Sequence, residues 1–117
     1  MGADAVCAGN LLAHPDVPTA MIGAFVEASG ALGARMLQAL RAGLAQGGEA
    51  GPIHSAGLLV VRDVSWPIVD LRVDWSEDDP VAALASIWDI DSPQIEDYVR
   101  RAVNPDAAPS FGVPGDL

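Results

Sequence analysis

The sequence predicts an α+β fold in which an antiparallel sheet packs against helices. The clearest signal is the segment 69–75 (VDLRVDW), where apolar and charged side chains alternate strictly, as in a strand with one buried face. A second signal is a set of segments whose apolar residues recur every three or four positions, the period of an amphipathic helix. With 117 residues, 50% of them hydrophobic, the chain has the size and composition of one folded domain.

The first half of the chain is predicted to form one strand and two helices. Residues 5–12 are mostly apolar and predict a short buried strand. Gly9 and Asn10 predict a bulge in this strand, because both residue types tolerate left-handed backbone. Residues 16–28 and 31–45 each carry an apolar stripe at helical spacing, so each is predicted to be a helix.

The second half is predicted to form a hairpin and two more helices. Residues 55–62 are a nearly continuous apolar run, which is typical of a central strand covered on both faces. Only a short turn separates this run from residues 69–75, so the two strands are expected to pair antiparallel. Acidic residues before Pro80 mark the start of a third helix, and Ser92 with Pro93 marks the start of a fourth.

This order of elements leaves the predicted sheet incomplete. Three short strands do not cover four helices, and an open sheet edge invites pairing with another strand. We therefore expect residues 1–103 to be half of a layered domain with a protein partner, supplied by a missing half or by self-association. Residues 104–117 are rich in Pro, Gly and Ala and are expected to form a separate C-terminal tail.

Charge and composition exclude several kinds of partner. Sixteen acidic residues against six basic ones give a net charge of −10, and no lysine is present. Because phosphate groups are bound by clustered lysine and arginine, neither nucleic acid nor an anionic membrane surface is an expected partner. No apolar run approaches the roughly 18–20 residues of a membrane span. The start lacks the basic and apolar segments of a secretion signal, so we expect a cytoplasmic protein.

Neither a metal nor another cofactor is expected. Cys7 is the single cysteine, which excludes an internal disulfide and a cysteine-based metal cluster. The histidines, His14 and His54, are far apart, and the acidic residues lack the spacing of metal ligands. The ordinary interpretation of Cys7 is a small buried residue, whereas cleavage before it would create an N-terminal nucleophile.

Several blocks of the sequence together resemble one bacterial family. The blocks are residues 8–12 (AGNLL), 48–58 (GEAGPIHSAGL), 69–75 (VDLRVDW), 78–80 (DDP) and 112–116 (GVPGD). From about residue 5 to the end, they resemble the C-terminal half of proteins of the "domain of unknown function 1028" family. Five ordered blocks are more specific than one short motif.

The resemblance implies a fold and a chemistry. The family is regarded as similar to the N-terminal-nucleophile (Ntn) hydrolases, four-layer αββα sandwiches in which a chain-terminal Thr, Ser or Cys attacks an amide. Its members are longer and usually begin with Met-Thr, and this sequence begins where their second half begins. The resemblance therefore implies half of an αββα sandwich, with the catalytic nucleophile outside the chain.

The charged face of the segment 69–75 is the first candidate site. Arg72 stands between Asp70 and Asp74, about 6.5–7 Å of strand rise from each. In one interpretation Arg72 orients a substrate carboxylate or holds an active-site acid by paired hydrogen bonds. In the other, the three residues form a charge ladder on a solvated face. The sequence leaves both interpretations open.

Three further residues complete the predicted site. The resemblance places Asn10 on a central strand, where it would stabilise an oxyanion; otherwise it satisfies backbone groups at a bulge. Ser55 is predicted to shape the site, and His54 to contact substrate together with Asp70 and Asp74. His54 is not expected to activate Ser55, because adjacent strand residues point to opposite faces.

The sequence thus supports functions of different classes. As part of an Ntn-type hydrolase, the chain would help cleave an amide bond in a small molecule, with Asn10, Ser55 and Arg72 in supporting roles. As a non-catalytic binding or assembly module, it would act through a partner chain; some members of the family carry a pilus-assembly label. A truncated reading frame without a role of its own is a third interpretation.

Overall fold

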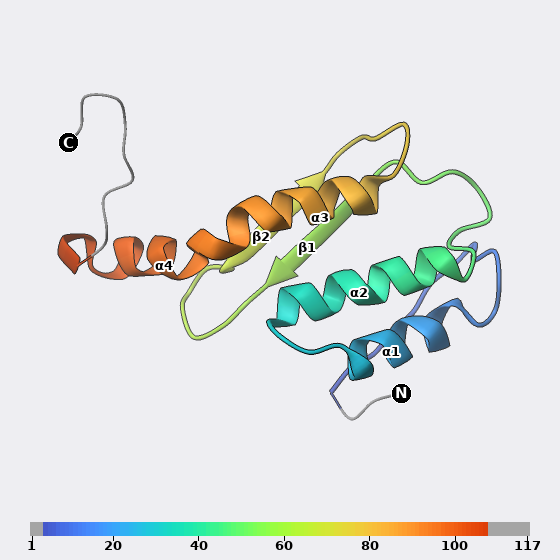
Figure 1. Ribbon diagram of the computed structural model, residues 1–117, viewed down its shortest axis with the longest axis horizontal. Coiled ribbons are helices and arrows are strands. Elements are labelled where there is room, and N and C mark those ends of the chain that lie inside the picture. The colour runs from blue at the N-terminus through green and yellow to red at the C-terminus, as the bar shows by residue number, and fades with distance from the viewer. Residues whose placement is uncertain (1–3, 108–117) are drawn as a thin grey trace.

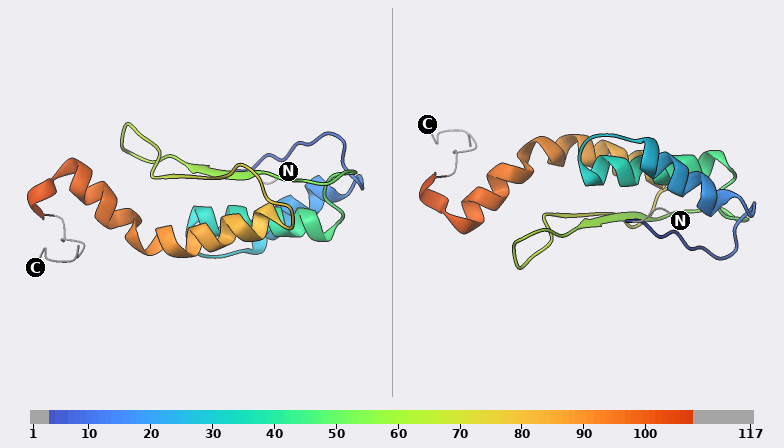
Figure 2. Two further views of the ribbon diagram at one scale, coloured as in Figure 1. Left: turned by 90° about the horizontal axis from the view of Figure 1, so that it is seen from above. Right: turned by 90° about the horizontal axis from the view of Figure 1, so that it is seen from below.

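The computed structural model describes residues 4–107, which form two layers. The main elements are α1 (Val17–Glu27), α2 (Leu32–Ala45), β1 (Ala56–Val60), β2 (Val69–Val73), α3 (Pro80–Asp91) and α4 (Ile95–Val103). Figure 1 labels these elements, and Figure 2 shows that the hairpin of β1 and β2 is one layer and that α1, α2 and α3 form the other. The helices cover only one face of the hairpin (Figure 2). This arrangement confirms the predicted α+β class.

The predicted antiparallel hairpin is confirmed, and it supplies half of the core. Ala56 pairs with Val73 and Val60 with Val69, so alternate residues of both strands face the helices. The core cluster comprises Leu37 of α2, Leu58 and Val60 of β1, Val69 of β2, Leu84 of α3 and Ile95 of α4. These residues join the two layers.

Local sequence explains where α2 ends and where α3 begins. The side chain of Asp79 accepts hydrogen bonds from the backbone N–H groups of Val81 and Ala82, at 3.0 Å each, which caps α3. At the end of α2, Gly47 and Gly48 adopt positive φ values of 126° and 62°. Their N–H groups bond back to the carbonyls of α2, the Schellman arrangement that glycine permits.

Two predicted strand features are wrong. Residues 5–12 form no strand; this segment makes a single antiparallel bridge, between Leu12 and Glu49. A strand needs a hydrogen-bonded neighbour, and no described strand is hydrogen-bonded to residues 5–10. β1 is also not covered on both faces, because Leu59 and Val61 on the outer face are 56% and 67% exposed.

The predicted start of the fourth helix at Ser92 is also wrong. Ser92 has helical backbone angles (φ −57°, ψ −38°), whereas a residue that caps a helix start has extended ones. The chain therefore continues from α3 through a 3-10 turn, Ser92–Gln94, and α4 begins at Ile95. The predicted tail from residue 104 begins with a second 3-10 turn, Pro105–Ala107, and its remainder lies outside the described residues.

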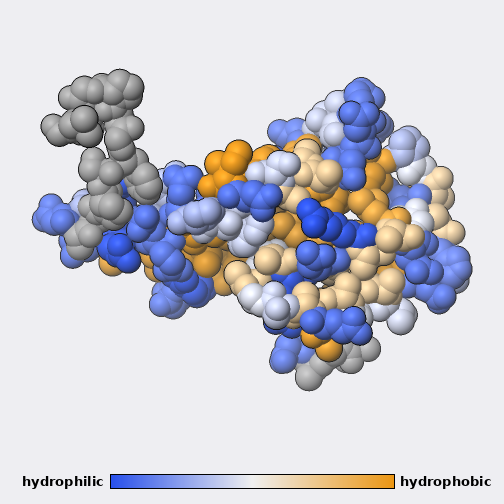
Figure 3. Space-filling model, viewed as in Figure 1, coloured by the Kyte–Doolittle hydropathy of each residue, from blue (hydrophilic) through white to orange (hydrophobic). Residues whose placement is uncertain are grey.

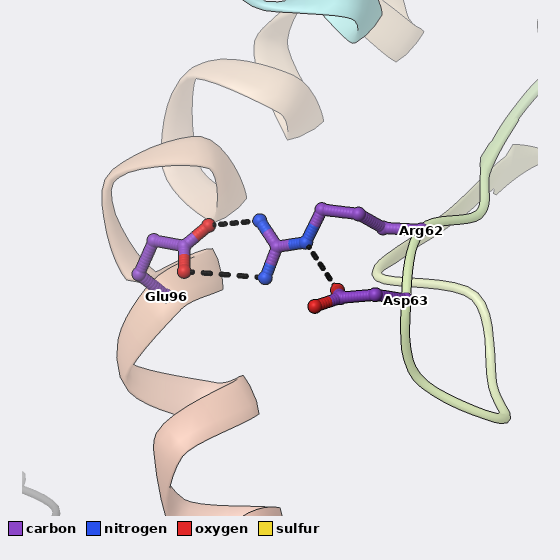
Figure 4. Close-up of polar contacts among 3 residues, drawn as sticks. All are labelled: Arg62, Asp63 and Glu96. Carbon is purple, nitrogen blue, oxygen red and sulfur yellow. Dashed lines mark hydrogen bonds and ion pairs between the residues drawn. The ribbon is translucent and has the colours of Figure 1, made fainter.

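Helix α4 projects beyond the two layers and is tied back by an ion-pair cluster. Figure 3 shows mainly hydrophilic residues over this projecting end. Arg62, after β1, donates to both carboxylate oxygens of Glu96 on α4, one at 3.3 Å, and to Asp63 at 3.0 Å (Figure 4). These hydrogen bonds lower the pKa of Glu96 and of Asp63 below their ordinary values of 4.5 and 3.8.

The attachment of α4 is expected to depend on pH. A carboxyl whose pKa is lowered by folding contributes its stabilisation above its ordinary pKa and loses it as the pH falls through the lowered value. Acidification from about pH 5 to about pH 3 should therefore speed hydrogen exchange in α4 relative to α3. Glu96→Gln should show the faster exchange already at neutral pH, and the exposed Asp89→Asn on α3 should not. Equal exchange in Glu96→Gln and the unaltered chain would contradict this role.

Candidate functional site

The charged residues of the predicted site lie on the outer face of the hairpin, which no helix covers. In the register of β1 and β2, Gly57 lies opposite Arg72. Continuing this register by two residues places Ser55 opposite Asp74 on the same face. Asp70 neighbours Arg72 along β2. The two strands thus present one serine, one arginine and two aspartates to the same side of the sheet.

The guanidinium of Arg72 is available to bind a ligand. Its Nε atom lies 4.0 Å from Oδ1 of Asp70, and the two side chains are 75% and 53% exposed. A solvated ion pair at this distance contributes little. Among residues 4–107, neither terminal nitrogen of Arg72 donates a hydrogen bond, and no ion pair joins Arg72 to Asp74. The charge ladder is therefore incomplete, and the paired N–H groups remain free for an anion.

Asn10 and Ser55 line the same groove. This groove, of about 350 Å³, lies between residues 8–12 and the start of β1. Both side chains are exposed, and neither forms a hydrogen bond within the described part of the chain. The predicted bulge at Gly9 and Asn10 is wrong, because the left-handed conformation falls on the next residue, Leu11 (φ 52°). This conformation is unfavourable for a leucine, so the backbone beside Asn10 is strained.

His54 has structural partners of its own. Its ring stacks on that of Trp75, with centroids 3.9 Å apart and planes 9° apart. Its Nδ1 lies 3.0 Å from the carbonyl oxygen of Ser76. Because a carbonyl only accepts, Nδ1 carries the proton and donates it, and Nε2 is left as the acceptor of the neutral ring. The expectations that His54 does not activate Ser55 and that it contacts substrate both stay predictions.

Cys7 lies beside α1 in a half-buried position. Its Sγ is 3.6 Å from Sδ of Met21, which is a contact between two polarizable sulfur atoms. Among the described residues, the side chains that line the hollows beside Cys7 include no histidine, lysine or arginine that would activate a thiol. Within the described residues, no group of three or more His, Cys, Asp or Glu is placed to hold a metal ion.

Two clusters of side chains around arginines could not be predicted from the sequence. Arg35 lies over the ring of Phe25, 4.1 Å from its centroid, and donates to the Phe25 carbonyl at 3.1 Å. These contacts join α1 to α2. In the second cluster, Glu96 follows Arg62 by 34 residues, a separation that carries no periodic pattern. Both clusters hold elements together, which distinguishes them from Arg72.

The sequence of this chain matches a family model, and its fold is similar to a solved structure. A family model described as "Family of unknown function (DUF1028)" matches residues 1–84, so the chain belongs to this family. The chain is also similar to the crystal structure of protein SPO2555 from Silicibacter pomeroyi, with 34% sequence identity and a TM-score of 0.61. The match covers 70% of this chain and 35% of that protein, so it spans about a third of the protein's length.

The search of curated proteins found no match. Within residues 4–107, no helix combines the length and apolar character that crossing a membrane requires. The family resemblance is confirmed by these findings. The correspondence to a C-terminal half and the Ntn-like chemistry stay predictions.

Proposed function

We propose that this chain forms one wall of the substrate site of an Ntn-type amide hydrolase. In this proposal the catalytic nucleophile comes from polypeptide outside these 117 residues. The observation that carries the proposal is Arg72, a guanidinium on an uncovered sheet face with its terminal N–H groups unpaired among the described residues. An arginine in this state suits the carboxylate of a small acidic substrate, because its paired N–H groups match the two oxygens.

Each predicted residue has a separate role in the proposed site. Arg72 binds the substrate carboxylate, and the flanking Asp70 and Asp74 accept hydrogen bonds from donor groups of the substrate. The side-chain amide of Asn10 donates to the oxyanion that forms when the nucleophile attacks the amide carbon. The strained backbone at Leu11 supports this role, since strain in a folded chain concentrates at functional positions. Ser55, which lies opposite Asp74 in the continued strand register, limits the substrate's position on the outer face of the hairpin.

The test combines this chain with the polypeptide it is proposed to need. The part of the Silicibacter pomeroyi protein outside the aligned region is expressed separately and mixed with the chain. The mixture, each component alone and the complete Silicibacter protein are assayed on small amides with and without a carboxylate. We expect hydrolysis of the carboxylate-bearing amides by the mixture and by the complete protein, and none by either component alone.

The Arg72→Ala variant tests the role of the outer face. It should raise KM for the carboxylate-bearing amides by at least about tenfold, the loss of one charge-assisted contact, with a smaller change in kcat. Amides without a carboxylate should be little affected. Arg41→Ala, which removes an exposed arginine of α2 away from this face, is the matched control. Equal effects of Arg72→Ala on both substrate types would reject the role.

The open edge of β1 favours a second function, a non-catalytic assembly module. A sheet edge that lacks a neighbour recruits strands irrespective of any chemistry. The same experiment separates the two functions. A mixture that forms a stable complex while both it and the complete protein leave the whole amide panel intact would reject the hydrolase and support the module.

A further inference from the structure

A slot runs between β1 and the N-terminal segment, residues 4–10. Figure 2 shows this segment on the same side of α1 and α2 as the hairpin. The slot consists of two hollows of about 360 and 350 Å³, and both are bordered by the N-terminal segment and by Gly57 of β1. Because they also share Met21 and Leu40, they follow one another along a continuous channel.

The floor of the slot is apolar and consists of side chains of α1 and α2. The hollow beside residues 4–7 contacts side chains of both helices: Met21, Ile22 and Phe25 of α1, and Leu32, Met36, Ala39 and Leu40 of α2. In most α+β domains such a helical face is covered by a sheet. Here the hairpin covers α3 and part of α2, and the remainder of this apolar face lies over the slot.

The two walls of the slot offer backbone rather than side-chain partners. The N-terminal segment joins the segment leading into β1 through the bridge between Leu12 and Glu49, with backbone hydrogen bonds from Ala13 to Gly48 and from Ala50 to Leu11. Beyond this bridge the segments diverge. No backbone hydrogen bond joins residues 4–10 to β1, and β1 has β2 as its single strand neighbour in the described part of the chain. The edge of β1 that faces the slot is therefore unpaired.

We propose that this slot receives an extended strand from polypeptide outside these 117 residues. The strand pairs with the free edge of β1 and turns alternate apolar side chains onto α1 and α2. The slot follows residues 4–10, which corresponds to about 20 Å of extended chain, the length of an ordinary strand. The occupant is a segment equivalent to the part of the Silicibacter protein with no counterpart here, since the match covers only 35% of that protein.

A second copy of this chain does not fit the slot. Residues 4–10 lie across the slot from the free edge of β1, so the β1 edges of two copies cannot meet without displacing residues 4–10 of each. Two copies would also each carry a net charge of −10, which opposes their association. A small apolar ligand would fill the floor but would leave the backbone groups of β1 unpaired.

The experiment uses short overlapping synthetic peptides that cover the part of the Silicibacter protein outside the aligned region. Each peptide is added to the complete chain, and three properties are measured: hydrogen exchange of residues 56–60, reactivity of the Cys7 thiol, and molecular mass in solution. Cys7 borders the hollow beside residues 4–7 and is the single cysteine, so its reactivity reports on the slot. We expect one peptide with alternating apolar residues to slow both exchange in β1 and the thiol reaction by at least about tenfold.

A matched pair of variants on α1 locates the peptide. Ile22→Glu places a carboxylate in the slot and should weaken peptide binding by at least about tenfold, because burying the charge is costly. Val26→Glu makes the same change one helical turn away, at a 59% exposed position outside the slot, and should alter binding by less than about twofold. Thermal unfolding of both variants verifies that they are folded.

Three results would overturn the proposal: no peptide protects β1, the chain alone is a dimer with β1 already protected, or both variants weaken binding equally. The proposal holds with or without catalysis. A peptide that protects β1 while the complete protein is inert would reject only the hydrolase. Hydrolysis by a mixture in which β1 stays unprotected would reject only the slot.

Discussion

Replacing Leu84 with alanine is expected to lower the free energy of unfolding by about 2–5 kcal/mol, the range for truncating a buried leucine. Leu84 is completely buried on α3, in the cluster that includes Leu58 of β1 and Val69 of β2. The variant leaves a cavity between the two layers, and the surrounding strands and helix close it only partly. Urea unfolding followed by circular dichroism gives the change as a shift of the midpoint at constant slope.

The control for Leu84 lies on the same helix. Ile90 is 70% exposed, so Ile90→Ala removes a comparable side chain without opening a cavity and should change stability by less than about 0.5 kcal/mol. Similar midpoints for the two variants would show that α3 does not pack on the hairpin as described. A change of slope in Leu84→Ala would instead report a loss of two-state unfolding.

Replacing Gly33 with alanine is expected to lower stability by about 1–3 kcal/mol, the cost of overpacking. A Cβ atom at Gly33 would lie 2.5 Å from Cζ3 and 2.6 Å from Cη2 of Trp88. The indole ring is packed against the core, so it cannot move aside freely. Gly33 is the second residue of α2, where alanine gains less helix propensity than in a helix interior. The overpacking should therefore outweigh the gain in helix propensity, so that the substitution lowers stability.

Gly23→Ala is the matched control, with the opposite expected sign. Gly23 is exposed in the middle of α1, and nothing lies within 4 Å of the Cβ position. Alanine there restricts the unfolded chain and should raise stability by about 0.5–1 kcal/mol. Thermal and urea unfolding of the two variants measure both signs. Stabilisation by Gly33→Ala would contradict the close approach of α2 and α3.

The elements that are fixed by local periodicity could be predicted from the sequence. Alternation in the segment 69–75 and the short turn before it gave the hairpin and its two faces. The stripes in 16–28 and 31–45 gave the first two helices within a few residues. The strand predicted at residues 5–12 failed because apolar composition shows that a segment is suited to pairing, whereas pairing itself depends on a distant neighbour. The prediction that β1 is covered on both faces failed for the same reason.

The candidate site was predictable only where residues lie on one strand or its immediate neighbour. Alternation alone places Asp70, Arg72 and Asp74 on one face, and the hairpin register brings Ser55 to it. The position of Asn10 across a groove from Ser55 depends on how the N-terminal segment folds back under α1, which no spacing encodes. The pairing of Arg62 with Glu96 depends on the course of α4 and was missed for that reason.

The direct connections between neighbouring elements have a consequence for how the chain folds. Residues 28–31 join α1 to α2, and residues 61–68 join β1 to β2, so each pair closes only a short loop. Domains built from contacts between sequence neighbours fold quickly. The helical pair and the strand pair are thus expected to form as separate units, which dock when Leu37 meets Leu58 and Leu84. In the proposed assembly the strand that enters the slot joins last, after this chain has already folded.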